Sequence, residues 1–114
     1  MRREPGEPFY RVETAEAGQM LAKDPVVLVD VRGKDDYRQG HIPGAVSIEL
    51  EQVYSRIKEV AGAPALLFVC YRGVTSALAC EVAVAAGHRM VYNLEGGMDA
   101  WVSQGLPVKA GSAP

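Results

Sequence analysis

Cysteine is scarce in this chain of 114 residues, which contains only Cys70 and Cys80. A secreted domain of this size that depended on disulfides would normally carry more than two cysteines. A structural zinc site would need closely spaced pairs of Cys or His, and the sequence has no such pairs. We therefore expect two reduced thiols, no metal site and no cofactor.

Long apolar runs and a strong excess of either charge are also missing. No stretch approaches the roughly 20 apolar residues of a membrane-spanning helix. The opening residues, MRREPGEPFYRV, lack the apolar segment of a signal peptide. The formal net charge is -2, so no basic field favours nucleic acid or an anionic membrane as a partner. These absences predict a soluble cytoplasmic protein that attracts any anionic substrate through local groups.

The chain does contain enough apolar material for one core. Its residues are 48% hydrophobic and 23% charged, which is an ordinary balance for a globular domain. We expect a single domain over residues 1–114, with a folded core at about residues 10–108 and flexible ends.

Strand-like and helix-like segments alternate along the sequence. Continuous apolar runs bounded by Pro or Gly indicate strands covered on both faces, and amphipathic or apolar segments of longer period indicate helices. Strands are expected at 9–12, 26–31, within 41–48, at 65–70 and at 90–94, and helices at 14–24, 34–40, 51–60, 75–87 and 97–105. The alternation predicts a three-layer α/β fold with a central, mainly parallel sheet flanked by helices.

The segment LLFVCYRGVTSALA, residues 66–79, places Cys70 where a strand meets a helix. Ligands of α/β folds gather at the carboxyl ends of strands. Only a thiolate is a good nucleophile, and the free N–H groups of a helix start, together with a tight turn at Gly73, could stabilise one. The local pattern is equally compatible with Cys70 as a small buried apolar residue, and Cys80 is expected in the core.

The helix start alone is too weak to activate the thiol. It contributes about 0.3–1 kcal/mol when exposed. Lowering a pKa by two units takes about 2.7 kcal/mol. Several amide hydrogen bonds and the charge of Arg72 would therefore be needed.

Cysteine phosphatases are a rival interpretation, and the same loop tests it. They place an arginine six positions after the cysteine, where it clamps the phosphoryl oxygens. This chain has Ser76 at that position, which argues against phosphate chemistry.

Three segments, VLVDVRGKDDYRQGHIPGAVSIEL, CYRGVT and LEGGMDAW, resemble in this order the signatures of the rhodanese-like sulfurtransferases. The resemblance covers about residues 10–108 and implies a rhodanese-like fold. It also implies that Cys70 is the catalytic residue, which takes the outer sulfur of thiosulfate as a persulfide. The sulfur would pass to a small acceptor (cyanide or a thiol) or to a sulfur-acceptor protein. The substrate-binding residues it implies are Tyr71, Arg72, Gly73, Val74, Thr75 and Ser76.

Other residues of these segments are expected to support the site. Arg32 is expected to pair with an acidic residue such as Asp36 and so hold its loop. Asp30 could instead hydrogen-bond the active loop. The ring of His41 is expected to bond the backbone of its turn, with a general-base role as the alternative. The pair Gly96 and Gly97 is expected to let the backbone pass close to the active loop.

Two functions remain open at this stage. The first is a single-domain thiosulfate sulfurtransferase. The second is a rhodanese-fold sulfur-relay or protein-binding module with little turnover of thiosulfate. An interaction domain without chemistry is less favoured, because such domains usually lose the cysteine and this chain retains Cys70.

Overall fold

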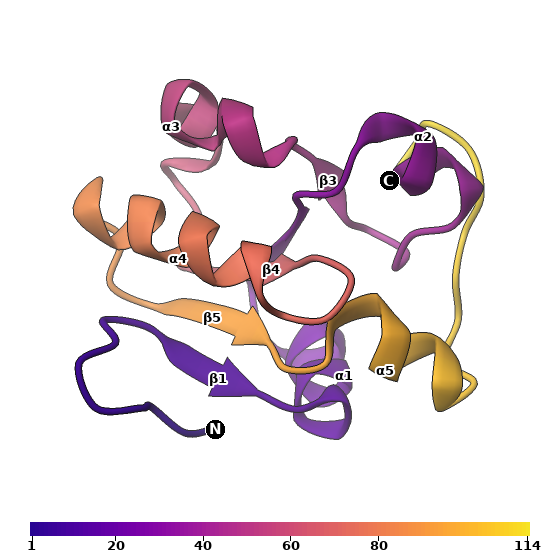
Figure 1. Ribbon diagram of the computed structural model, residues 1–114, viewed down its shortest axis with the longest axis horizontal. Coiled ribbons are helices and arrows are strands. Elements are labelled where there is room, and N and C mark those ends of the chain that lie inside the picture. The colour runs from indigo at the N-terminus through magenta and orange to yellow at the C-terminus, as the bar shows by residue number, and fades with distance from the viewer.

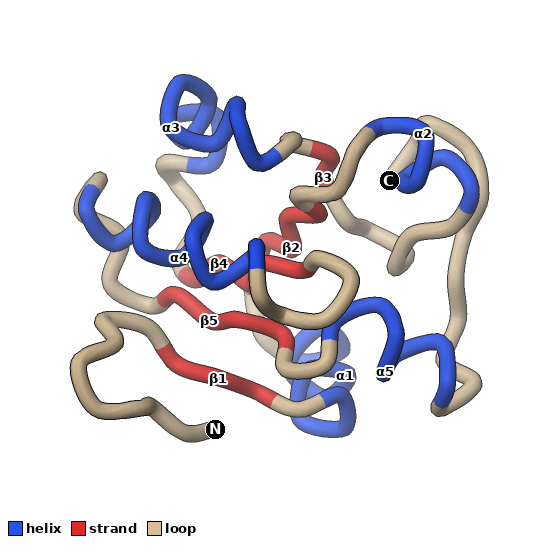
Figure 2. The backbone as a smooth tube through the Cα atoms, in the orientation of Figure 1, coloured by secondary structure: helices blue, strands red, loops and turns tan.

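The computed structural model, which describes residues 1–114, contains a five-stranded sheet with helices on both faces (Figures 1 and 2). The strand order is β1-β5-β4-β2-β3, and every pair of neighbouring strands runs parallel. The strands are β1 (Tyr10–Val12), β2 (Val26–Asp30), β3 (Val46–Ser47), β4 (Ala65–Val69) and β5 (Val91–Leu94). The helices are α1 (Thr14–Lys23), α2 (Lys34–Gln39), α3 (Val53–Arg56), α4 (Thr75–Ala85) and α5 (Gly97–Ser103). The predicted α/β class and parallel sheet are confirmed.

Two apolar layers, one on each face of the sheet, hold the fold together. On one face the side chains of β4 join an apolar cluster with residues of α3 and α4, which includes Phe68, Ala79 and Cys80. On the other face they join an apolar cluster with residues of α1, α2 and α5, which includes Leu67 and Trp101. Because successive strand residues point to opposite faces, β4 supplies both layers and is buried on both sides. Trp101 lies in the core and donates its ring N–H to the carbonyl oxygen of Pro107.

The segment expected to form one helix over 51–60 is divided. A 3-10 turn at Leu50–Gln52 leads into α3, and a second 3-10 turn follows at Ile57–Val60. The breaks fall at Gln52 and Arg56, where φ is -102° and -110° and ψ is close to zero. Val53 and Val60 still reach the core, so the apolar spacing identified the buried face but not the regularity of the helix.

Both ends of the chain are attached to the body of the fold by backbone hydrogen bonds. Near the N-terminus, Arg2 and Arg11 exchange backbone hydrogen bonds of 2.9 and 2.6 Å. Near the C-terminus, Lys109 and His41 do the same at 2.8 and 3.0 Å. None of the helices has the length and apolar character needed to cross a membrane.

The loop of residues 70–74 lies at the carboxyl edge of the sheet, between β4 and α4 (Figure 1). Its strand is central, with β2 on one side and β5 on the other. The crevices of open α/β sheets form at this edge. The fold thus presents Cys70 at the position where such proteins bind ligands.

Candidate active site

Cys70 is the first residue after β4, one position beyond the end of the strand, and only 2% of it is exposed. The chain then turns sharply at Gly73, whose φ is +88°. This turn directs the N–H of Gly73 to the Cys70 Sγ at 3.1 Å. A Cβ at Gly73 would lie 3.0 Å from the carbonyl oxygen of Leu94. Both the backbone angle and the close approach therefore favour glycine, as the sequence suggested.

The loop lowers the pKa of the Cys70 thiol to about 7 from an ordinary 9.0. Burial alone raises that pKa, because it disfavours the charged form. In the thiolate form, hydrogen bonds from the side chains of Ser76 and Thr75 and from the backbone N–H groups of Ser76 and Arg72 outweigh this effect. The thiolate is therefore far more populated at neutral pH than in an ordinary cysteine.

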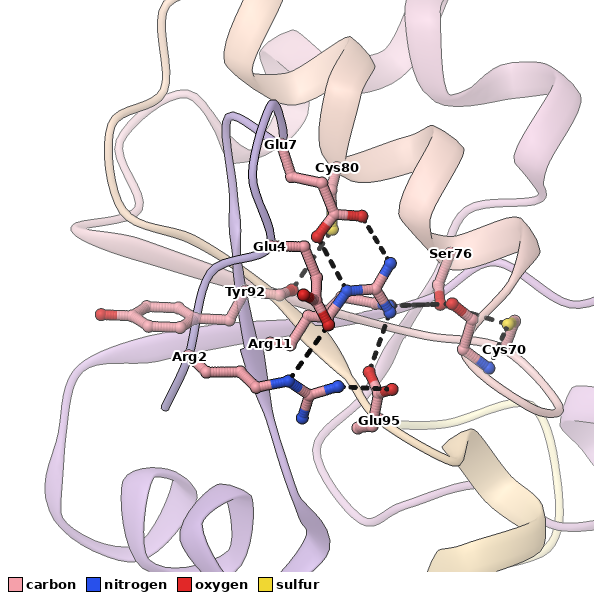
Figure 3. A network of polar contacts seen from close by, with 11 residues as sticks. Arg2, Glu4, Glu7, Arg11, Cys70, Ser76, Cys80, Tyr92 and Glu95 are labelled. Atoms are coloured by element: carbon pink, nitrogen blue, oxygen red, sulfur yellow. Dashed lines mark hydrogen bonds and ion pairs between the residues drawn. The ribbon is translucent and has the colours of Figure 1, made fainter.

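Ser76 and Asn93 form a buried polar pair beside the sulfur, and both are fully shielded from solvent. The Ser76 Oγ lies 3.1 Å from the Cys70 Sγ, and Figure 3 shows these two side chains facing each other. The same hydroxyl donates to the Asn93 Oδ1 at 2.5 Å. The amide of Asn93 donates in turn to the carbonyl oxygen of Gly73 at 2.8 Å. The sequence analysis included Ser76 but missed Asn93. The feature that could have revealed Asn93 is a polar amide side chain within the otherwise apolar strand MVYNL.

The start of α5 lies against the backbone of the active loop. The N–H groups of Met98 and Asp99 donate to the carbonyl oxygens of Cys70 and Tyr71 at 2.8 and 2.9 Å. A Cβ at Gly97 would lie 2.4 Å from the carbonyl oxygen of Cys70. The expected close passage beside the active loop is confirmed at Gly97, and α5 fixes the direction in which Cys70 enters the loop.

Arg72 and Val74 lie on the outside of the loop. Arg72 is 80% exposed, and its Nε contacts the Asp99 Oδ2 at 3.1 Å. Val74 is 71% exposed, and Thr75 begins α4. The guanidinium is therefore near the loop but shared with a carboxylate, which weakens the positive potential expected from Arg72.

Tyr71 borders a cleft of about 540 Å³ between α2, α5 and the active loop. Its ring covers the Arg32 guanidinium, with the Cζ atom 5.2 Å from the ring centroid. A hydrogen bond to Asp36 raises the pKa of the Tyr71 hydroxyl, as do burial and the negative charge of that carboxylate. The apolar part of the cleft comes from Met98, Val102 and Val108.

Arg32 pairs with an acidic residue as expected, but the suggested partner Asp36 is wrong. Arg32 binds Asp30 instead, with its Nη2 and Nε 2.8 and 3.1 Å from the carboxylate, and its backbone N–H also donates there. Residues two apart at a strand end share a face, whereas Asp36 lies in the following helix. The Arg32 Nη2 also reaches the carbonyl oxygen of Gly40 at 2.7 Å. Asp30 thus anchors the turn before α2 rather than the active loop.

His41 is fully buried and contacts the backbone, as expected. Its Nδ1 lies 2.8 Å from the carbonyl oxygen of Tyr37, and its Nε2 lies 2.9 Å from that of Ala113. The ring stacks on Tyr37 with a centroid distance of 3.7 Å. Both ring nitrogens are occupied by the main chain, which leaves none free to act as a general base.

Cys80 lies in the core, with its Sγ 3.4 Å from the carbonyl oxygen of Tyr92. Burial strongly raises the pKa of its thiol, which therefore stays protonated at neutral pH. Neither cysteine is in a disulfide. No group of three or more His, Cys, Asp or Glu side chains is arranged to hold a metal ion.

Comparison with known proteins agrees with this geometry. The Rhodanese-like domain family matches residues 13–104. The thiosulfate sulfurtransferase GlpE of Pseudoalteromonas translucida (strain TAC 125) is 31% identical over 93 residues, which cover 82% of this chain and 89% of that protein.

Solved structures with the same fold include a rhodanese-like domain protein from Staphylococcus aureus. It is 32% identical with a TM-score of 0.77, over 90% of this chain and 100% of its own. A thiosulfate sulfurtransferase from Pseudomonas aeruginosa is 24% identical with a TM-score of 0.82, and the match spans 92% of this chain but only 21% of that one. With the match across residues 13–104 and the parallel sheet around Cys70, the chain belongs to the rhodanese-like family.

Proposed function

We propose that this protein is a sulfurtransferase that takes the outer sulfur of thiosulfate as a persulfide on Cys70. The observation that carries the proposal is a nearly buried thiol, held at the end of a central strand, whose pKa is lowered to about 7. A perturbed nucleophile in such a position is typical of a functional site. The 31% identical thiosulfate sulfurtransferase supports the choice of donor.

The first step is a displacement at sulfur. The Cys70 thiolate attacks the outer sulfur of thiosulfate, the new S–S bond forms, and the old one breaks with its electron pair on sulfite. The products are a Cys70 persulfide anion and sulfite, so charge and electrons balance. Sulfite leaves as an anion without a proton, and no general acid is required. This fits a site in which the ring of His41 is bound to the main chain.

The second step regenerates the sulfur-free enzyme. A thiophilic acceptor such as cyanide attacks the outer sulfur of the persulfide and leaves as thiocyanate, which restores the Cys70 thiolate. Between the steps the persulfide needs N–H donors and positive potential. The N–H of Gly73, the start of α4 and the guanidinium of Arg72 are the groups that would supply them. Both cysteines are free thiols, which favours a reducing compartment such as the cytoplasm.

A second candidate is a relay module that exchanges sulfur with a partner protein and turns over thiosulfate slowly. Three exposed apolar side chains within the short segment 71–78 favour it, because apolar surface grouped beside a reactive residue suits contact with a partner protein. These side chains are Tyr71, Val74 and Leu78.

Intact mass after incubation with thiosulfate tests the proposal. We expect the protein to gain the mass of one sulfur atom and to lose it on addition of cyanide, with thiocyanate produced in equal amount. Cys70→Ser should abolish the gain, and the matched control Cys80→Ser should retain it. Absence of sulfur uptake by the unmodified protein would contradict the enzyme and leave the relay module as the better account.

A further inference from the structure

A closed ring of hydrogen bonds passes through Cys70, Gly73, Asn93 and Ser76. The Gly73 N–H donates to the Cys70 Sγ at 3.1 Å, and the Asn93 Nδ2 donates to the Gly73 carbonyl oxygen at 2.8 Å. The Ser76 hydroxyl donates to the Asn93 Oδ1 at 2.5 Å and lies 3.1 Å from the Cys70 Sγ. Both polar side chains of the ring are inaccessible to water.

The position of every hydrogen in this ring follows from the donors available. A carbonyl oxygen can only accept, so the Asn93 amide must direct its Nδ2 to Gly73 and its Oδ1 to Ser76. The single hydrogen of the Ser76 hydroxyl is therefore engaged with Asn93. The contact between Ser76 and Cys70 must then be a thiol S–H that donates to the Ser76 Oγ.

Ionisation of Cys70 removes that S–H hydrogen and changes what the sulfur needs from Ser76. A thiolate accepts hydrogen bonds, so the Ser76 hydroxyl must rotate and donate to the sulfur. The rotation leaves the Asn93 Oδ1 buried without a donor, which is unfavourable. Asn93 and the thiolate thus compete for one hydrogen.

We propose that Asn93 is a positioning residue that acts through Ser76. It keeps the hydrogen of the Ser76 hydroxyl directed away from the sulfur and so sets how readily Cys70 ionises. The proposal rests on Cys70 being the reactive nucleophile of the proposed function. It assigns to Asn93 an effect opposite to that of the loop amides, because the amides favour the thiolate and Asn93 opposes it.

The test is the pH dependence of the rate at which iodoacetamide alkylates the protein, since this reaction needs no sulfur donor. Asn93→Leu keeps the branched shape of the side chain and removes both polar contacts. The Ser76 hydroxyl is then free to donate to the thiolate. We expect the midpoint of the pH profile to fall by roughly 0.5–1 unit, which raises the rate below the midpoint about three- to tenfold. Asn93→Asp keeps an acceptor for Ser76 and should move the midpoint upward.

Ser76→Ala supplies the control that separates positioning from a general structural role. This variant removes the hydroxyl that the thiolate and Asn93 share. The thiolate then loses a donor, so the midpoint of the alkylation profile should rise. In the Ser76→Ala background, Asn93→Leu should have no further effect, because the two residues act as a coupled pair. The charged and titratable groups near the loop, Arg72, Asp99 and Cys80, are the same in all variants.

Two outcomes would overturn the proposal. One is an unchanged or raised midpoint in Asn93→Leu with the fold intact by circular dichroism. The other is an equal shift with and without Ser76, which would place the effect in the Gly73 contact instead. If Asn93→Leu does not fold, a lowered midpoint in Asn93→Asp contradicts the proposal equally. Alkylation is independent of thiosulfate turnover, so failure of the proposed function and failure of this inference remain distinguishable.

Discussion

Ionisation of Cys70 should make the stability of the whole fold depend on pH. The pKa of this thiol is about 7 in the folded protein against an ordinary 9.0, so between these values the unfolded chain holds a proton that the folded one has lost. The free energy of unfolding should therefore rise by about 2 kcal/mol as pH rises from 7 to 9. As pH falls through 7 this contribution should disappear.

Urea unfolding at several pH values checks this, with Cys70→Ser as the reference that does not titrate. The difference between the two proteins isolates Cys70 from all other groups. Cys80 is buried and protonated in both, so it cancels. A difference in unfolding free energy that stays constant from pH 7 to 9 would mean that the loop does not stabilise the thiolate.

Arg72 should matter for thiosulfate and little for stability. It is exposed and paired only with the exposed Asp99, a type of ion pair worth at most about 1 kcal/mol. We expect Arg72→Ala to raise KM for thiosulfate severalfold while thermal unfolding changes little. Asp99→Asn releases the guanidinium and should leave KM equal or lower. Equal losses of stability and of thiosulfate use in Arg72→Ala would make the residue structural.

At this scale the sequence identified residues whose chemistry is local. Cys70 and Gly73 stand out because a thiol and a turn glycine follow a strand directly. Asn93 did not stand out, because its partners Ser76 and Gly73 are 17 and 20 positions away and meet it only through the pairing of β4 with β5. The partner of Arg32 was misassigned for a similar reason, since the direction of its side chain depends on where β2 ends.

Among the elements, α5 is the one most closely fitted to the active loop. At Gly97 φ is +55° and a Cβ would collide with the backbone of Cys70 and Tyr71. We expect Gly97→Ala to lower the unfolding free energy by about 2 to 4 kcal/mol, through backbone strain and overpacking together. The displaced loop should also slow alkylation of Cys70 at neutral pH.

Gly105, just beyond the other end of α5, is the matched control. Its φ is +72°, yet nothing lies within 4 Å of a Cβ built there. Gly105→Ala should therefore show backbone strain alone, about 1 kcal/mol, with unchanged alkylation. If both variants lose the same stability and reactivity, the contact between α5 and the loop is not what sets the position of Cys70.

Element types and their order followed from the sequence, while their geometry did not. Apolar runs such as 65–69 and the glycines at 87 and 105 gave the alternation of strands and helices. The break of the 51–60 segment into α3 and two 3-10 turns could not be read, because the spacing of Val53 and Val60 indicates only that both face the core. The strand order could not be read either, because apolar runs buried on both faces look alike in the sequence.

For the molecule as a whole, ion pairs connect the N-terminal segment to the loop between β5 and α5. Glu95, in the loop before α5, forms ion pairs with Arg11 at 2.9 Å and with Arg2 at 3.2 Å. Arg11 also forms an ion pair with Glu7 (Figure 3). Most of these side chains are half-buried, so the network should stabilise more than isolated surface pairs do. We expect Glu95→Gln to lower the unfolding free energy by about 1 kcal/mol at low salt.

High salt should reduce that loss, because mobile ions screen the partly exposed charges. Glu59→Gln is the control: it breaks a single exposed pair with Arg56 and should have almost no effect at any salt concentration. A loss in Glu95→Gln that does not depend on salt would indicate a packing role for Glu95 instead.

The strand order also affects how the protein is made. The cradle of Cys70 is completed by Asn93 and Gly97, and the edge strand β1 has no partner until β5 is available. A nascent chain that has left the ribosome only as far as α4 thus lacks the strand and the helix start that hold the active loop in place. The order of synthesis therefore delays an organised active loop until β5 and the start of α5 have also emerged and paired.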